Sequence, residues 1–274
     1  MAEQASDRQS IVYVAGLNNS GSTWLSILLA QMENTANIGE VWYSLETPDQ
    51  LAEDKYGCTC GATMAECEFW GPILKERESI GGMDLQHARV LDRFRETYPG
   101  KVMIDSSKFV RTLDKGWLSD KNRDQVDVKV IHIVRDYRGW ANKRQRAYTA
   151  QGRWRLLYMH CVRWYFRNKA REVYLKKSEL SSMTLSYESL VFNFKDELKR
   201  IADFTGLKIP ENWGSIDPES LSLHMARGNS MRMDTAAFSE VRYDSRWMLD
   251  SRYLWLGPLL IPFHIYWKRV NRKK

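Results

Sequence analysis

The stretch IVYVAGLNNSGSTWLSILLAQM, residues 11–32, decides the fold. It begins with a short run of Val, Ile and other apolar residues, which is typical of a buried strand, and it ends with an apolar run typical of a helix. The loop between these runs carries Gly16 and Gly21 at the spacing of a phosphate-binding loop. A loop that binds a nucleoside triphosphate continues with a lysine, but here Ser22 and Thr23 follow the second glycine. The stretch therefore keeps the spacing and lacks the lysine.

A strand, a glycine-containing turn and a helix direct backbone N–H groups and the positive end of the helix dipole at one point, where an anion binds. Ser20 joins Ser22 and Thr23 as a hydroxyl donor. Transfer from a nucleoside triphosphate usually needs a lysine and Mg²⁺. The loop offers neither this lysine nor an evident acidic magnesium ligand. We therefore expect it to hold a less charged group, such as a single phosphate that bears a sulfonate.

The composition is that of an ordinary globular protein. The chain has 274 residues, of which 43% are hydrophobic and 27% charged, so it is long enough to bury a core. No linker or repeat divides it, and we expect one domain over residues 9–265 followed by a basic tail at 266–274. The net charge of +7 suits an anionic ligand, a nucleic acid or an acidic membrane. The polar start has no signal-peptide core, so the expected location is the cytoplasm.

Four short apolar runs predict strands, and helix-like stretches separate them. The expected strands are residues 11–15, 102–105, 128–134 and 183–187. The expected helices are residues 23–32, 84–98, 109–118, 138–148, 154–177 and 196–204. This alternation predicts an α/β fold, a P-loop-like parallel β-sheet flanked by helices. Ligands bind at the carboxyl ends of such strands, and we expect an insertion at about 40–100 and a late loop at about 206–255 to cover that edge.

The third expected strand runs into VIHIVRDYRGWANKRQR, residues 130–146. Arg135 stands at the carboxyl end of the strand and Arg146 on the helix that follows. Arginine forks suit phosphate through paired, charge-assisted hydrogen bonds. A solvated basic helix paired with Asp136 is the alternative, which we expect to hold for Arg144. Two anion sites on one sheet edge imply a nucleotide that is phosphorylated at two places.

These stretches together resemble the sulfotransferase superfamily, whose donor is 3′-phosphoadenosine-5′-phosphosulfate (PAPS). NNSGSTWL is similar to its 5′-phosphosulfate loop, and VIHIVRDYRGWANKRQR is similar to its 3′-phosphate motif. Further stretches resemble elements of the bacterial and carbohydrate-type members, and they follow in family order: GEVWYSL, CTCGATMAECEFW, IDSSK, LSYESL and HMARGNSMR. The resemblance covers about residues 11–250 and rests on the conjunction of these motifs.

The resemblance implies a donor site and its residues. It assigns the phosphosulfate to Asn19, Ser20, Gly21, Ser22, Thr23 and Trp24. It assigns the 3′-phosphate to Arg135, Asn142 and Arg146. Further donor contacts are expected from Tyr187, Arg227, Gly228 and Asn229. For Tyr187 a structural hydrogen bond is the alternative, and for the late residues a mobile basic loop.

The sequence departs from the family pattern at two positions. Asn19 stands where the family often has a lysine or arginine that polarises the bridging oxygen, and we expect Lys108 to supply that charge. Asn142 replaces a serine, and its amide can still donate. Glu40 lies in the GEVWYSL element and is the expected general base for the acceptor proton. A surface or helix-capping glutamate is the alternative.

Two features have no part in the expected donor site. Cys58, Cys60 and Cys67 form a C-x-C-x6-C cluster without an evident fourth ligand, so we expect a packed loop with buried thiols and keep a metal site as the alternative. The stretch 253–267 is apolar but interrupted by prolines and too short to span a membrane. It predicts either a helix packed on the domain or, with the basic tail, a peripheral membrane contact.

The sequence thus predicts a PAPS-dependent sulfotransferase that acts on a hydroxyl of a small-molecule, carbohydrate or lipid acceptor and releases adenosine 3′,5′-bisphosphate. No histidine grouping indicates a catalytic metal, and we expect neither a metal requirement nor a nucleic-acid partner. His224 is expected to brace the late loop. Two alternatives stay open: an ATP-dependent small-molecule kinase with the same loop, and a non-catalytic protein that binds anionic ligands or membranes.

Overall fold

The computed structural model describes residues 8–46, 57–147, 154–213, 217–234 and 243–272. Its centre is a five-stranded sheet with the strand order β2-β3-β1-β4-β5. The strands are β1 (Gln9–Gly16), β2 (Thr35–Gly39), β3 (Val102–Lys108), β4 (Val126–Val134) and β5 (Ser182–Ser186). Each pair of neighbours is parallel. This arrangement confirms the predicted α/β fold with a parallel sheet.

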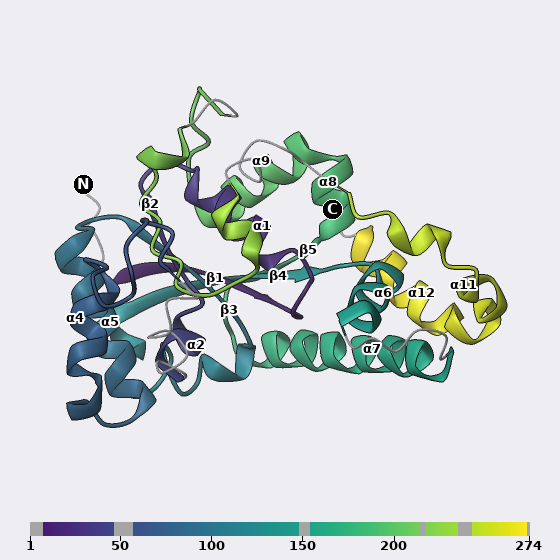
Figure 1. The fold of residues 1–274 in the computed structure, drawn as a ribbon, viewed down its shortest axis with the longest axis horizontal. Coiled ribbons are helices and arrows are strands. Elements are labelled where there is room, and N and C mark those ends of the chain that lie inside the picture. Colours follow the sequence, from purple (N-terminus) through teal and green to yellow (C-terminus); the bar gives the residue numbers. More distant parts are fainter. Residues whose placement is uncertain (1–7, 47–56, 148–153, 214–216, 235–242, 273–274) are drawn as a thin grey trace.

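Helices flank both faces of the sheet (Figure 1). Those at the amino-terminal half are α1 (Ser22–Ala30), α2 (Val41–Glu46), α4 (Trp70–Glu76) and α5 (Met83–Thr97). Those that follow β4 and β5 are α6 (Tyr137–Ala147), α7 (Trp154–Lys177), α8 (Tyr187–Phe192) and α9 (Phe194–Thr205). The last two are α11 (Arg252–Trp255) and α12 (Gly257–Asn271). In Figure 1, α1, α8 and α9 lie on one side of the sheet, and the long α7 lies on the other.

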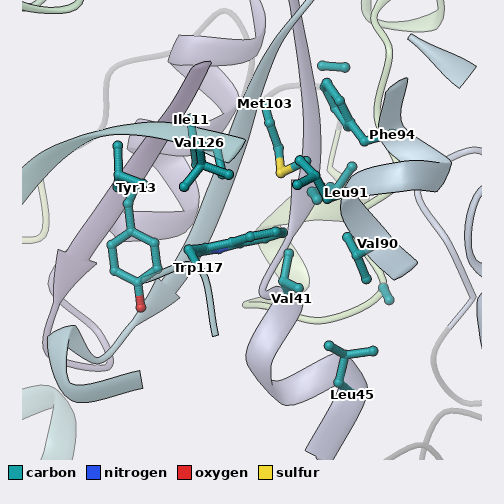
Figure 2. Close-up of a cluster of buried hydrophobic side chains, with 14 of the residues drawn as sticks. Ile11, Tyr13, Val41, Leu45, Val90, Leu91, Phe94, Met103, Trp117 and Val126 are labelled. Carbon is teal, nitrogen blue, oxygen red and sulfur yellow. The ribbon is translucent and has the colours of Figure 1, made fainter. Parts of the chain in front are cut away.

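The core forms on both faces because successive strand residues point to opposite sides. In β1, Val12 and Val14 pack into a cluster with α1, α8 and α9. Ile11 and Tyr13 point the other way, into a cluster with Trp117 and residues of α2, α4 and α5. Figure 2 shows Trp117 in this cluster together with side chains of α2 and α5. A sheet buried on both faces needs near-continuous apolar strands, which is how the runs in the sequence read.

The structure contains helices that the sequence did not predict, namely α2, α4 and α8, and it differs further at β2 and at residues 109–118. The edge strand β2 was not expected, because it has only five residues, TANIG, and a buried polar Asn37 among them. The prediction of a helix at residues 109–118 is wrong, because a 3₁₀ turn at Val110–Thr112 is followed by further turns. These turns carry Trp117 into the core, where its indole donates to Asp105 Oδ2 at 2.7 Å. A tertiary hydrogen bond here overrides the local helical pattern.

The carboxyl-terminal helix packs on the domain with one face only. Leu260, Phe263 and Tyr266 join a buried cluster with residues of α6 and α7. The helix runs unbroken to Asn271 and so continues past residue 265, where the domain was expected to give way to a basic tail. Within the described residues, no helix combines the length and the apolar character needed to cross a bilayer.

Candidate active site

The loop between β1 and α1 has the backbone expected of an anion site. Gly21 has a φ of 94°, and a Cβ at this position would lie 2.6 Å from the ring of Tyr187, so only glycine fits. Asn19 has a φ of 70°, a left-handed conformation that asparagine tolerates better than most residues. The α1 helix begins at Ser22 with its N–H groups directed at this loop. Within the described chain, the buried Ser20 hydroxyl has no hydrogen-bond partner.

Glu40 and Lys108 form a salt bridge beside this loop. Glu40 directly follows β2, and Lys108 is the last residue of the neighbouring β3, so the order of the strands brings them together. Their side chains are 6% and 9% exposed, which means that most water is excluded from the pair. Lys108 reaches this position with a φ of 71°, next to an irregularity in the pairing of β1 with β3. The expected base and the expected cation are thus direct partners.

Asp105 holds this pair in place, a role that the sequence did not reveal. Its buried carboxylate accepts from the Ser107 backbone N–H at 2.9 Å and from the Trp117 indole at 2.7 Å. It also accepts, at 3.4 Å, from the N–H of Val41, the residue after Glu40. Burial raises the pKa of Asp105 to about 6, and these hydrogen bonds oppose the rise. The IDSSK segment therefore fixes the start of α2 to the end of β3.

Arg135 lies at the end of β4, as expected, and it is engaged on three sides. One amino group donates to the carbonyl oxygen of Asn19 at 3.3 Å, and the other donates to Asp244 Oδ2 at 3.0 Å. The guanidinium lies 5.0 Å from the ring centre of Tyr187, which contacts Trp24 edge-on at 5.8 Å. Hydrogen bonds from Arg246 and Arg135 hold the pKa of Asp244 well below its usual range. A carboxylate therefore occupies the position where Arg135 would receive an anion.

The helix α6 presents Lys143, not Asn142, to this anion site. Consecutive helical residues point about 100° apart, so the two neighbours face different surroundings. Asn142 donates to Asp250 Oδ2 at 3.2 Å and does not line the cavity, contrary to the expected 3′-phosphate contact. Lys143 lines the cavity, and burial together with Arg135 lowers its pKa. Arg146 belongs to α6, but its side chain is outside the described residues.

The late loop covers the glycine loop and Glu40. The Asn229 N–H donates to Thr23 Oγ1 at 3.4 Å. Gly228 has a φ of 141°, and a Cβ there would lie 3.5 Å from Glu40 Oε1. Gly39 is tighter, since a Cβ there would lie only 2.9 Å from the Cα of Met225. The backbones of three remote segments therefore meet around Glu40.

The glycine loop, the Glu40–Lys108 pair, Arg135, Lys143 and the late loop surround one cavity of about 650 Å³, a size suited to a nucleotide-sized ligand. The expected residues that line it are Asn19, Gly21, Ser22, Thr23, Trp24, Glu40, Lys108, Arg135, Tyr187, Arg227, Gly228 and Asn229. Ser20 and Asn142 do not line it. Residues that the sequence reasoning missed are Asn18, Tyr43, Lys143, Met231, Asp234, Tyr243, Asp244 and Arg246. Lys143 and Asn18 stand beside predicted residues, and Tyr43 and Met231 lie within the recognised stretches, whereas no motif singles out Asp234, Tyr243, Asp244 and Arg246.

The sequence model of the sulfotransferase domain family matches residues 9–248. No curated protein matches the chain. Solved structures that resemble it include the sulfotransferase domain from the curacin biosynthetic pathway, with 15% identity over 92% of this chain and 98% of that one and a TM-score of 0.48. The sulfotransferase domain from the Synechococcus PCC 7002 olefin synthase has 16% identity over 95% and 98%, with a TM-score of 0.49. Mouse sulfotransferase SULT7A1, complexed with PAP, has 12% identity over 93% and 84%, with a TM-score of 0.49.

Proposed function

This chain belongs to the sulfotransferase domain family, and we propose that it transfers the sulfuryl group of PAPS to a hydroxyl of a small-molecule, carbohydrate or lipid acceptor. The observation that carries the proposal is the Glu40–Lys108 pair, which lines the same cavity as the glycine loop and Arg135. A proton acceptor, a cation and an anion-binding helix start are the groups that sulfuryl transfer needs.

The residues of the cavity fit the two phosphates of this donor. The helix start at Ser22, the Thr23 hydroxyl and Lys108, which all line the cavity, would hold the 5′-phosphosulfate. Arg135 and Lys143 would hold the 3′-phosphate, in the place where Arg135 now contacts Asp244. The Lys143 ammonium takes the role that we had expected of Asn142. The product, adenosine 3′,5′-bisphosphate, would keep both phosphate contacts.

The proposed reaction is an in-line displacement at sulfur. When bound, the donor supplies a sulfur atom that is linked to the 5′-phosphate through a bridging oxygen. The acceptor oxygen forms a bond to sulfur while the bond to the bridging oxygen breaks, and the acceptor proton passes to Glu40. Lys108 stabilises the negative charge that gathers on the bridging oxygen, which offsets the cation missing at Asn19. In this reaction the chain's own side chains supply the proton acceptor and the positive charge.

Family membership argues against a kinase, because the matched domain is that of sulfuryl transfer. The test offers the chain a panel of phenols, saccharides and lipids with either ³⁵S-labelled PAPS or γ-³²P-labelled ATP and Mg²⁺. We expect label to reach an acceptor from PAPS alone. Transfer from ATP, or an absence of transfer from PAPS to every acceptor class, would contradict the proposal.

The outer side of α11 and α12 supports a lipid surface as a neighbour of this enzyme. The apolar side chains exposed there are Leu254, Trp255, Leu259, Ile261 and Ile265. They recur at helical spacing, and the exposed Lys268 and Arg272 continue the same side toward the end of the helix. An apolar strip with cations at one end is the pattern of a helix that lies on an acidic membrane. We therefore propose that this face contacts a membrane with anionic lipids.

Vesicle sedimentation tests this contact. Phosphatidylcholine vesicles that contain phosphatidylserine should pull down the wild type, and those without it should pull down less. The double variant Leu254→Ser/Trp255→Ser should stay in solution, while Phe192→Ser, which alters an exposed apolar side chain on α8, should bind as the wild type does. Equal binding of all three proteins, or a dimer that only the double variant disrupts, would assign this face another role.

A further inference from the structure

Three sulfur atoms and one imidazole nitrogen meet at the edge of the insertion. The sulfurs of Cys58 and Cys67 lie 3.6 Å apart. His224 directs its Nδ1 at both, at 3.7 Å from Cys58 and 3.2 Å from Cys67. The sulfur of Cys60 completes the group, in which all four ligand atoms lie within 4.8 Å of one another. His224 follows Cys58 by 166 residues, which is why the cysteine spacing alone lacked a fourth ligand.

The separations among Cys58, Cys67 and His224 are close to the edges of a metal-centred tetrahedron. Zinc–sulfur bonds of about 2.3 Å and zinc–nitrogen bonds of about 2.0–2.1 Å set ligand-to-ligand distances of about 3.6–3.8 Å. The two contacts of Cys58 have this length, and the contact between Cys67 and His224 is slightly shorter. A disulfide needs sulfurs about 2.0 Å apart. The four cysteines of the chain are free in this structure.

The surroundings of the group are those of an ordered metal site. The second ring nitrogen of His224 lies 3.4 Å from Glu68 Oε1, the carboxylate–histidine arrangement that orients a metal-bound imidazole. The backbone N–H of Trp70 donates to the sulfur of Cys67 at 3.4 Å. The rings of Phe69 and Tyr98 lie beside the imidazole, with distances of 5.7 and 5.8 Å between ring centres. Cys58, Cys67 and His224 are buried, while Cys60 is exposed and leaves a path for entry.

We propose that Cys58, Cys60, Cys67 and His224 bind a zinc ion as a structural Cys₃His site. Three thiolates and an imidazole in a tetrahedron favour zinc over the oxygen-seeking cations. All four positions belong to the protein, so the ion has no open position for a substrate and serves the fold rather than the reaction. The site is independent of the donor and lies outside the cavity described above.

The ion would join the insertion to the late loop. Hydrogen bonds already link the two: the Trp70 indole donates to the His224 carbonyl at 2.6 Å, and the Met225 N–H donates to Thr59 Oγ1 at 2.9 Å. His224 also extends the edge of β2, because its N–H donates to the carbonyl of Asn37 at 2.8 Å. Gly228, which lies against Glu40, follows His224 by four residues. A metal bound by His224 would therefore fix the late loop, which covers the cavity, to the edge of the sheet.

Metal analysis of the purified chain tests the site without any enzymatic assay. The protein is prepared without a histidine tag and measured by inductively coupled plasma mass spectrometry, and we expect one zinc ion per chain. Cys60→Ser and Cys67→Ser should each lower the zinc content at least fivefold. Cys161→Ala, which removes the cysteine of α7, should keep it. Because the Cys60 side chain is exposed, its replacement leaves the core packing intact and separates loss of metal from loss of folding.

Cobalt provides the second readout. Addition of Co²⁺ to metal-depleted wild type should produce the intense visible absorption of a tetrahedral thiolate complex, and Cys60→Ser should weaken it. A wild type with no zinc and no cobalt absorption would overturn the proposal. So would a disulfide between Cys58 and Cys67 in protein that is purified under reducing conditions, or an equal loss of zinc in Cys161→Ala. None of these results depends on whether the chain transfers a sulfuryl group.

Discussion

The cavity has two charged centres that differ in how they are built. Glu40 and Lys108 are nearly buried, pair with each other and are held by the ends of two adjacent strands. Arg135 pairs instead with Asp244, a half-buried carboxylate from the late loop. The protein alone positions Glu40 and Lys108, as expected of preorganised catalytic groups. The second centre holds an internal anion that a phosphate would replace, which suits binding and release.

The largest expected effect comes from Glu40→Gln, which removes the proposed proton acceptor and keeps the shape of the side chain. Turnover should fall about 10²- to 10⁴-fold, the usual contribution of general base catalysis. The affinity for adenosine 3′,5′-bisphosphate, measured by calorimetry, should change less than about threefold. If turnover stays normal, Glu40 is not the base. If the affinity collapses as well, the two centres do not divide chemistry from binding.

Arg135→Ala should act in the opposite way. It would remove the charge-assisted hydrogen bond that we propose to the 3′-phosphate, worth about 1.5–3 kcal/mol, so affinity for the bisphosphate should fall about 10- to 10²-fold. Adenosine 5′-monophosphate, which lacks that phosphate, should bind the variant and the wild type alike. An equal loss for both nucleotides would mean that Arg135 contacts another part of the donor or supports the loop through Asn19.

The structure assigns a 3′-phosphate contact to Lys143, whereas the sequence motif assigned it to the neighbouring Asn142, so variants of the two residues test one assignment against the other. Lys143→Ala should weaken bisphosphate binding about fivefold to tenfold, as expected for the loss of one cation from a half-buried site. Asn142→Ala is the matched control on the same helix and should change binding less than about twofold. The reverse order of effects would restore the 3′-phosphate contact that the sequence motif suggested.

Removal of the Asp244 carboxylate should have a smaller effect, and it should strengthen bisphosphate binding rather than weaken it. Asp244→Asn removes the carboxylate that competes for Arg135, so bisphosphate binding should tighten by about twofold to fivefold, the range of a partly exposed ion pair. Titration calorimetry at low salt would measure it. Weaker binding in this variant would show that Asp244 contacts the donor itself.

Glu188 offers a change that should alter stability and leave the chemistry alone. It lies behind the second centre, where its carboxylate accepts from the Asp136 N–H, and burial together with Asp136 raises its pKa to about 7. Since the folded state then binds the proton more tightly than the unfolded state does, stability falls as pH rises from about 4 to about 7, by on the order of 3 kcal/mol. Glu188→Gln should lack that fall when urea unfolding is compared at about pH 5 and pH 8. An unchanged pH slope would contradict the raised pKa.

The parts of the site that are local in sequence were predictable. The glycine loop, Arg135 at its strand end and the parallel sheet follow from periodicity and glycine spacing within short windows. Asp105 and Asp244 were not predictable, because their roles depend on contacts with Trp117 and Arg135 that local periodicity does not encode. The same holds for His224, which contacts Cys67 across 157 residues of sequence. Lys143 was missed because only the rotation of α6 decides which of two adjacent residues faces the cavity.

The central claim, a site for a nucleotide with phosphates at both its 3′ and 5′ positions, is tested most directly by calorimetric titration of the wild type. We predict that adenosine 3′,5′-bisphosphate binds with a dissociation constant at least about tenfold below that of adenosine 5′-monophosphate, since the second phosphate adds charge-assisted hydrogen bonds. ATP with Mg²⁺ should bind more weakly than the bisphosphate. Equal affinity for the two adenosine phosphates, or a preference for ATP with Mg²⁺, would contradict the account.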